Sequence, residues 1–390
     1  MTHFRVQDFG QIQSVDLSFG DLTLLVGPQA TGKSVLLQLF KLAQDHQSIC
    51  HTLKQHGYDW QNELTHLLEV VFGEGMGGLH RATSTVALDG ECIDLKARAS
   101  EAGRRSRKAE SVFLVPAQRV LMLENGWPRP FDGFQDGTPY VLRNFSEQLR
   151  QLMEKGLGGG DGLLFPKTGR MKKALRDQLD ESMFHGAQVQ LETINFKRRI
   201  VIDADNNRLP FMTWSAGQRE FMPLLLGLYW LMPSSGGSKK PDIDWVVIEE
   251  PEMGLHPQAI LSVMLIALEL MQRGYKVVIS THSPMFLEMA WVLRVLKEHN
   301  ADPESLYALF QLERSPAITE IFRSVLDEKT LTTSYFEPQA NGKVVVQDIS
   351  SLDPFDENDA VADWGGLTSF STQAADVVAA AIQEATVNEF

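Results

Sequence analysis

The chain has 390 residues, which is enough for one large α/β domain with an insertion or for two domains, and its 43% hydrophobic and 22% charged residues exclude a disordered protein. A formal net charge of -14 argues against a surface coated with basic residues for nucleic acid, so protein partners are favoured over DNA, although a local basic groove is compatible with an acidic protein. The two cysteines, Cys50 and Cys92, exclude a disulfide framework and a structural zinc site, and they favour a reducing, cytoplasmic setting.

The hydrophobic pattern also disfavours a membrane protein. The N-terminus has no basic region followed by an apolar core, so no signal peptide is expected. The most apolar run, 221–232, is too short to span a bilayer and contains Pro223 and Gly227. We therefore expect this run to form a buried helix of a cytoplasmic protein.

The N-terminal part predicts strands followed by a phosphate-binding loop. Alternating runs between Phe4 and Phe19 predict strands packed on one face, and Leu22–Val26 predicts a buried strand. A glycine-rich loop, G-P-Q-A-T-G-K-S, and an apolar helix follow, in the order of a P-loop. Such a loop binds phosphates through its backbone N–H groups and its lysine, and its serine hydroxyl ligates Mg²⁺. The candidate nucleotide-binding residues are Gly27, Gln29, Ala30, Thr31, Gly32, Lys33 and Ser34.

The middle of the chain mixes strand and helix patterns. Between residues 64 and 95, the pieces L-L-E-V-V-F and T-S-T-V-A-L predict antiparallel strands, and residues 111–116 predict a buried strand that ends just before Gln118. Residues 145–155 and 169–183 predict helices, and 189–202 alternates like a strand. For the basic stretches at 96–108 and 167–176, solvated surfaces are favoured over contacts with nucleic acid.

The hexapeptide S-A-G-Q-R-E at 215–220 directly precedes the apolar helix. Ser215 and Gly217 at a helix start can form an anion site, because a hydroxyl, free N–H groups and the helix dipole converge there. A plain N-cap is the competing interpretation. The same pattern therefore supports either a ligand site or a local helix signal.

Two acids follow the next buried strand, which is predicted at Trp245–Ile248. Glu249 and Glu250 would lie at the carboxyl edge of a parallel sheet, where α/β proteins bind ligands, and adjacent acids there commonly serve a cation and a proton. A helix is expected over 257–272, and a further buried strand over 275–280 places His282 at the same edge.

The C-terminal region loses this order. Residues 306–312 predict the last core strand, and from Glu313 onward no alternation of strand and helix is expected. Five acids between residues 353 and 363 favour a solvated acidic surface over a docking strip for a partner.

Five motifs together resemble those of ABC-type ATPases, in the same chain order. G-P-Q-A-T-G-K-S resembles Walker A, W-S-A-G-Q-R-E the signature motif, V-V-I-E-E-P-E Walker B, G-L-H-P the D-loop region and S-T-H-S-P the switch histidine. The opening F-R-V-Q-D-F-G-Q-I-Q-S-V-D-L-S-F is similar to the first strands of the RecF, SMC and OLD group of soluble ABC ATPases. The resemblance spans roughly residues 1–310 and is poor between about 50 and 210.

This resemblance implies an α/β fold, namely an ABC-type P-loop NTPase head with a mixed or parallel core sheet, an N-terminal antiparallel strand subdomain and a helical insertion. We expect an N-lobe with Walker A at 1–120, a helical or lid insertion at 121–212, a C-lobe with the other motifs at 213–312 and an acidic extension at 313–390.

The family's mechanism implies a head-to-tail homodimer that encloses ATP and Mg²⁺. Glu250 would polarise the attacking water and His282 would sense the γ phosphate, while Ser34 and Glu249 would serve the metal. The remaining implied contacts to nucleotide or metal come from Ser215, Gly217, Gln218 and Gln118. Two positions depart from the family pattern: Glu249 replaces the usual aspartate, and Ala216 stands where many relatives have glycine.

We therefore expect an active ATPase without an intrinsic nuclease, which regulates or scaffolds a separate effector, a nuclease or a toxin, in anti-phage defence. An alternative is a DNA-clamp ATPase for repair or maintenance, with the two basic stretches lining its groove. A third interpretation is a scaffold in which nucleotide is structural. Salt-dependent retention of duplex DNA separates the clamp from the other two.

Overall fold

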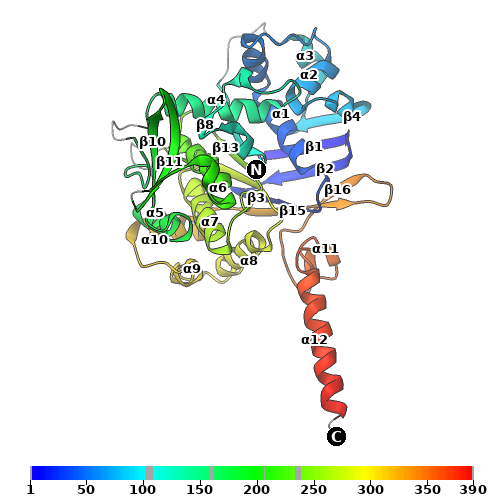
Figure 1. Cartoon of the computed structure of the whole chain (residues 1–390). Coiled ribbons are helices and arrows are strands. Elements are labelled where there is room, and N and C mark those ends of the chain that lie inside the picture. Colours follow the sequence, from blue (N-terminus) through cyan, green and yellow to red (C-terminus); the bar gives the residue numbers. More distant parts are fainter. Residues whose placement is uncertain (1, 102–108, 158–161, 206, 233–238, 389–390) are drawn as a thin grey trace.

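A ten-stranded sheet forms the centre of the molecule (Figure 1). The computed structural model describes residues 2–101, 109–157, 162–205, 207–232 and 239–388. The sheet is built from β1 (Thr2–Phe9), β2 (Ile12–Phe19), β3 (Leu22–Val26), β4 (His80–Leu88), β5 (Glu91–Cys92), β6 (Val112–Val115), β13 (Trp245–Glu249), β14 (Lys276–Ser280), β15 (Leu331–Pro338) and β16 (Val344–Asp348). Their order is β5-β4-β1-β2-β16-β15-β3-β14-β13-β6.

The sheet is mixed, as predicted. The neighbours from β15 through β3, β14 and β13 to β6 are parallel, whereas β1, β2, β4 and β5 pair antiparallel. The carboxyl ends of β3, β6, β13 and β14 therefore meet at one edge, which is where ligands bind in such sheets. This arrangement confirms the predicted α/β class.

Helices cover both faces of the parallel strands (Figure 1). They are α1 (Lys33–Gln55), α2 (Leu64–Phe72), α3 (Leu95–Glu101), α4 (Tyr140–Glu154), α5 (Lys173–Leu179), α6 (Ala216–Leu231), α7 (Pro257–Gln272), α8 (Pro284–Glu298), α9 (Glu304–Phe310), α10 (Pro316–Glu328), α11 (Asp359–Ala362) and α12 (Ser369–Asn388). Among these helices in the described residues, none has the length and apolar composition that a bilayer-spanning segment needs.

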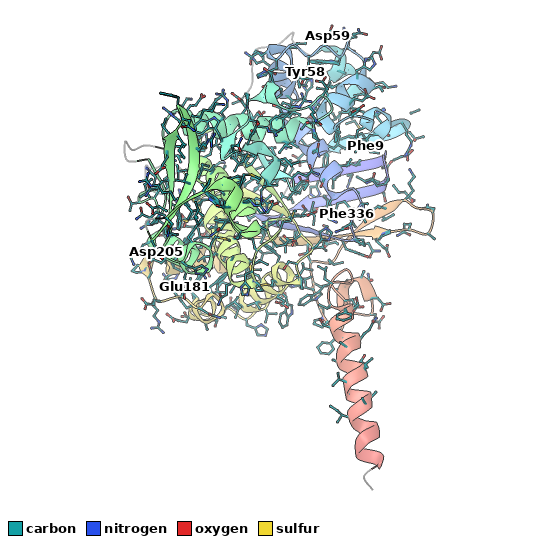
Figure 2. All side chains as sticks on the ribbon, in the orientation of Figure 1. Phe9, Tyr58, Asp59, Glu181, Asp205 and Phe336 are labelled. Carbon is teal, nitrogen blue, oxygen red and sulfur yellow. The ribbon has the colours of Figure 1, made fainter. Side chains whose placement is uncertain are left out.

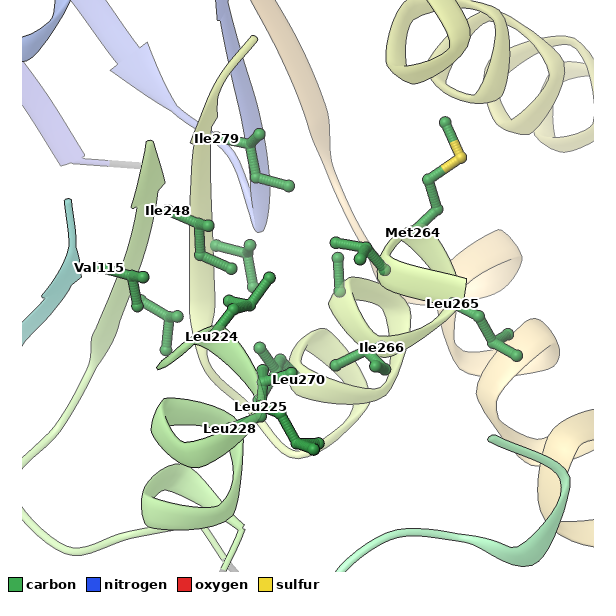
Figure 3. Close-up of a cluster of buried hydrophobic side chains, with 14 of the residues drawn as sticks. Val115, Leu224, Leu225, Leu228, Ile248, Met264, Leu265, Ile266, Leu270 and Ile279 are labelled. Carbon is green, nitrogen blue, oxygen red and sulfur yellow. The ribbon is translucent and has the colours of Figure 1, made fainter. Parts of the chain in front are cut away.

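The apolar run of β13 is continuous because both of its faces are buried. Val246 and Ile248 pack with α6 and α7, whereas Trp245 and Val247 pack with α1 on the opposite face. Figure 3 shows Ile248 and Ile279 of the sheet on the side of the cluster that faces Leu224 of α6 and Ile266 of α7. Hydrophobic packing on both faces of β13 therefore holds the residues that follow this strand in position.

The insertion contains a second sheet in addition to helices. Its four strands are antiparallel, in the order β12-β11-β10-β9. They are β9 (Leu163–Phe165), β10 (Gln188–Ile194), β11 (Lys197–Ala204) and β12 (Asn207–Pro210). The single strand expected at 189–202 is a hairpin, because Asn195 and Phe196 adopt left-handed conformations with φ of 50° and 63°. In Figure 2, Asp205 and Glu181 mark this part of the molecule, on the side away from Phe336.

Short helical turns and a small ribbon connect these elements. They are the 3₁₀ turns η1 (Met76–Leu79), η2 (Arg119–Met122), η3 (Phe131–Gly133) and η5 (Phe211–Thr213), the π-helical turn η4 (Asp180–Phe184), and the paired strands β7 (Leu123–Glu124) and β8 (Trp127–Pro128). The helix expected at 169–183 is thereby divided into α5 and η4.

Two predicted strands are helices. L-L-E-V-V-F belongs to α2, whose buried residues recur at helical spacing: Leu64, Leu67, Leu68, Val71 and Phe72. The expected last core strand at 306–312 is α9, which ends where Gln311 turns left-handed at φ 52°. A short apolar run fits a buried strand and a helix equally well. The spacing of the apolar residues on either side of the run is needed to tell the two apart.

The prediction that order is lost after Glu313 is wrong. This region forms α10, β15 and β16, and β15 lies beside β3 in parallel, with Leu331 opposite Leu22 and Tyr335 opposite Val26. Its strand character was hidden because β15 contains the polar run T-T-S, in which Thr333 and Ser334 are buried and the Thr332 hydroxyl bonds to Thr23 of β3. Beyond this strand pair, α12 projects away from the body (Figure 1).

Candidate functional site

The P-loop conformation depends on two glycines. Gly27 ends β3 at φ 143°, and a Cβ there would come within 2.7 Å of the Phe336 carbonyl oxygen on β15. Gly32 is the N-cap of α1 at φ 90° and offers no side-chain cap, so the first N–H groups of α1, which have no intrahelical partner, are not capped by its side chain either. Between them, Gln29 and Ala30 are exposed, and Ala30 has φ 59°. Free N–H groups and a helix N-terminus make this loop an anion site.

Lys33 is folded against the loop itself. Its Nζ donates hydrogen bonds to the carbonyls of Gly27 at 2.7 Å and Pro28 at 2.8 Å, and the residue is 6% exposed. Burial lowers the pKa of Lys33 to about 8, against the opposing effect of Glu250 and Glu252. Thr31 closes the loop by donating from its hydroxyl to the Pro28 carbonyl.

Glu249 occupies the buried end of β13 and reaches the P-loop helix. Its Oε2 accepts a hydrogen bond from the Ala117 N–H at 3.2 Å, and the Ser34 hydroxyl lies close enough to this carboxylate to favour its charged form. Burial raises the pKa of Glu249, and its Oε1 is buried without a hydrogen-bond partner in the described part of the chain. A carboxylate oxygen and a hydroxyl at this position are ligands of the kind that Mg²⁺ prefers. The structure thus brings Ser34 and Glu249 together.

Glu250 and His282 lie at the ends of neighbouring strands. The Glu250 N–H donates to the Ser280 carbonyl at 2.8 Å, and Glu250 Oε1 lies 3.6 Å from His282 Nε2. Both side chains are partly exposed. Glu250 also has φ 43°, a conformation that turns its side chain away from the strand pattern. The expected proximity of the second acid and the histidine is therefore present.

The segment at 215–220 is a helix N-terminus with a capping box. The Gln218 N–H donates to Ser215 Oγ, and the Ser215 N–H donates to Gln218 Oε1, each at 3.2 Å. Ser215 and Ala216 are exposed. Within the described residues, no hydrogen bond or ion pair joins this segment to the P-loop of the same chain. The predicted N-cap is therefore present, and Ser215 and Ala216 at the start of the helix remain exposed to solvent.

Gly217 links this helix start to the turn after the two acids. A Cβ at Gly217 would lie 2.7 Å from the Gly254 carbonyl oxygen, so only glycine permits the close approach. Gly254 itself has φ 69°. The candidate signature segment and the candidate D-loop region therefore pack against each other within one chain.

Gln118 is exposed at the end of β6, immediately before η2. Its chain neighbour Ala117 donates to Glu249, so the Gln118 backbone lies beside the buried acid. This placement keeps Gln118 at the same sheet edge as Ser34 and Glu249.

Sequence reasoning missed two residues of this edge. Glu252 Oε1 accepts from Thr281 Oγ1 at 2.8 Å and from the His282 N–H at 2.7 Å, and so holds the loop that carries the histidine. Arg119 is 0% exposed and donates to three backbone carbonyls near the two acids. Two features of the sequence could have indicated them. Glu252 is the third acid of E-E-P-E, and Arg119 is a basic residue that closely follows a buried strand.

Only part of the two basic stretches lies in the described residues. Arg104, Arg105, Arg107 and Lys108 of the first stretch lie outside the described residues, as does the glycine run at 158–161. In the second stretch, Arg170 donates to the Tyr229 carbonyl, Lys172 pairs with Glu269 and Arg176 donates to the Met171 carbonyl. Lys172 is thus paired with a carboxylate, whereas Arg170 and Arg176 donate to neutral carbonyls of the same chain.

Comparisons with known proteins give one family match and several structural matches of low TM-score. Residues 124–288 match the family described as "AAA domain, putative AbiEii toxin, Type IV TA system". The Thermotoga maritima SMC head domain is 12% identical, with 89% of this chain and 97% of that chain covered at a TM-score of 0.36. The Pyrococcus furiosus Smc head bound to the ScpA C-terminal domain is 11% identical, with coverage of 90% and 97% and a TM-score of 0.39. The cbiO1 protein of Clostridium perfringens is 12% identical, with coverage of 72% and 78% and a TM-score of 0.31. Curated protein sequences gave no match.

Proposed function

From the premise that the chain contains an ABC-type P-loop ATPase domain, we propose that it binds ATP with Mg²⁺ and hydrolyses it. The observation that carries this proposal is the meeting of Ser34, the unpaired oxygen of Glu249 and the exposed carboxylate of Glu250 at one sheet edge. Phosphoryl transfer requires mainly positioning and charge neutralisation, and no covalent nucleophile is needed. Lys33 and a metal held by Ser34 and Glu249 would supply the neutralisation.

Each residue has a defined task in this proposal. The P-loop N–H groups and Lys33 bind the phosphates, and Ser34 and Glu249 hold the metal. When bound, Mg²⁺ supplies charge neutralisation at the phosphates. Glu250 accepts a proton from the attacking water, and His282, 3.6 Å from it, contacts the γ phosphate. Gln118 contacts the metal or this water.

We propose further that two copies pair head to tail. Ser215, Gly217 and Gln218 lie at a helix start that is open to solvent and unconnected to the P-loop of its own chain. In the pair, this helix start meets the γ phosphate of ATP bound to the other copy. ATP then acts as part of the interface, and hydrolysis separates the copies.

The process that ATP hydrolysis controls is a separate question from hydrolysis itself. We propose that the dimer controls a separate effector protein in the cytoplasm, in anti-phage defence. The family description names a putative toxin of a type IV toxin–antitoxin system, which accords with this context. The DNA-clamp alternative finds no specific support in the second basic stretch, where Arg170, Lys172 and Arg176 contact carbonyl or carboxylate groups of the same chain.

Glu250→Gln tests the proposal. The variant should bind ATP with unchanged affinity but lose at least about 100-fold in hydrolysis, because an amide cannot accept the proton. ATP should then hold it as a dimer, measured by light scattering. Glu328→Gln, at an exposed position on α10, is the matched control and should hydrolyse ATP at the wild-type rate. Equal hydrolysis by Glu250→Gln and wild type would contradict the assignment of Glu250.

A further inference from the structure

Arg119 lies between the parts of the chain that face two different nucleotides. We propose that it is a positioning residue that couples the two ATP sites of the dimer, by joining the carboxylate edge of its own site to the helix that reaches the other site. The inference rests on the proposed function. It assigns to Arg119 a role in communication rather than in chemistry.

The contacts of Arg119 define this link. Its Nε donates to the Glu220 carbonyl at 3.0 Å, its Nη1 to the Glu249 carbonyl at 3.0 Å and its Nη2 to the Glu250 carbonyl at 3.2 Å. The first carbonyl belongs to α6 and the other two to the end of β13. One rigid, planar guanidinium therefore joins the first turns of α6 to the end of β13.

Burial makes this link stiff. Arg119 is 0% exposed, so water cannot replace a hydrogen bond that is lost when one element moves. Burial lowers the pKa of the guanidinium, against the opposing effect of surrounding carboxylates of which Glu220 is the strongest. A buried cation bonded to three carbonyls resists displacement of any one of them.

Movement at one site therefore reaches the other. Glu249 and Glu250 serve the ATP bound to their own chain, so a backbone shift there on nucleotide binding pulls on the guanidinium. Glu220 lies in the first turns of α6, next to the Ser215 and Gly217 segment that meets the other ATP. The contact of Gly217 with Gly254 gives the same two segments a second point of attachment.

Arg143 provides a matched control for a merely structural role. It is also a buried arginine, at 2% exposure, and it donates to the Tyr58 hydroxyl and to the Gln135 carbonyl. These partners belong to neither α6 nor the end of β13. Arg119→Lys and Arg143→Lys thus remove the same planar group from equally buried positions, and lysine cannot serve three diverging carbonyls.

The experiment measures ATP hydrolysis against ATP concentration. Wild type and Arg143→Lys should give Hill coefficients approaching 2, the number of sites. Arg119→Lys should give a coefficient near 1, with kcat lower by about tenfold to a hundredfold and KM changed by less than about threefold. A wild-type Hill coefficient of 1, an unchanged coefficient in Arg119→Lys or an equal loss in Arg143→Lys would overturn the coupling role. Absence of any hydrolysis in wild type would instead contradict the proposed function.

A second measurement does not depend on the folding of Arg119→Lys. Ala216→Arg places a charge on the exposed helix start and should keep the chain monomeric while the P-loop is intact. In this monomer, ATP should alter hydrogen exchange at residues 216–220 together with residues 249–254. Exchange at 216–220 that is insensitive to ATP, while the P-loop amides respond, would also overturn the coupling role.

Discussion

Lys33 and Glu249 share an electrostatic property at the sheet edge. Burial disfavours the charged form of each, lowering the pKa of Lys33 to about 8 and raising that of Glu249. A ligand of opposite charge would stabilise each charged form, phosphate for Lys33 and Mg²⁺ for Glu249. Both residues lie at the same edge of the sheet, so a phosphate group together with Mg²⁺ would stabilise both charged forms.

Lys33→Met should separate nucleotide binding from folding. The substitution removes two hydrogen bonds to loop carbonyls but also removes a buried charge, so the Tm without ATP should change by less than about 4 °C. The affinity for ATP should fall about 100-fold, or about 2.8 kcal/mol. Thermal shift with ATP and Mg²⁺ measures both effects, with Lys173→Met, at an exposed lysine, as control. A normal ATP shift in Lys33→Met would exclude this P-loop as the binding site.

Site residues that belong to a short sequence motif could be predicted. Site residues whose contacts are distant in the sequence could not. The loop from Gly27 to Ser34 and the acids after β13 follow from a short pattern of strand, turn and helix. Arg119 bonds to carbonyls 101 to 131 residues away, and Glu252 to a loop about 30 residues away. All three partners of Arg119 and one of the two partners of Glu252 are backbone groups, which every residue possesses, so no side-chain pattern in the sequence identifies them.

At the scale of elements, a buried charge network fixes β6 to α1 and α4. Lys41 of α1 lies 3.1 Å from Glu110, which also accepts from the Tyr140 hydroxyl at 2.7 Å, and Lys41 donates to the Val112 carbonyl at 2.6 Å. Asp45 accepts from the Val112 N–H at the start of β6. Because β6 leads to Gln118 and α1 begins at the P-loop, this network sets the distance between two sides of the site.

Glu110→Gln should reveal this network in the pH dependence of stability. Burial alone would raise the pKa of Glu110, but Lys41 and the hydrogen bonds of Tyr140 and Asn144 lower it below its ordinary value of 4.5. A lowered pKa contributes stability that is fully present above that value and is lost as pH falls through the folded-state pKa. The variant should therefore be about 1–3 kcal/mol less stable than wild type at pH 7, and the difference should shrink below about pH 4.5.

Urea unfolding at pH 7 and at pH 4 measures this difference. Glu313→Gln, at an exposed position, is the control and should match wild type at both pH values. A constant difference between Glu110→Gln and wild type over this range would show that Glu110 is stabilised by packing rather than by its charge.

At the scale of the molecule, the C-terminal region completes the sheet. β15 and β16 insert between β3 and β2, so the P-loop strand has a neighbour from the far end of the chain. This insertion could not be predicted from apolar patterning, because the pairing depends on strands more than 300 residues away, as for Thr23 and Thr332. The motif-bearing strands, by contrast, were recognisable because they are buried on both faces.

Two truncations should separate the roles of the C-terminal elements. Ending the chain after Gly366 removes α12, whose side chains over 371–382 are exposed, and should change the Tm by less than about 2 °C. Ending it after Lys329 removes β15 and β16, exposes the backbone edges of β3 and β2, and takes away Phe336, against which Gly27 packs. This shorter chain should be insoluble or lack an ATP-dependent thermal shift. A soluble chain ending at Lys329 with a wild-type ATP shift would show that the P-loop holds its shape without its C-terminal neighbour.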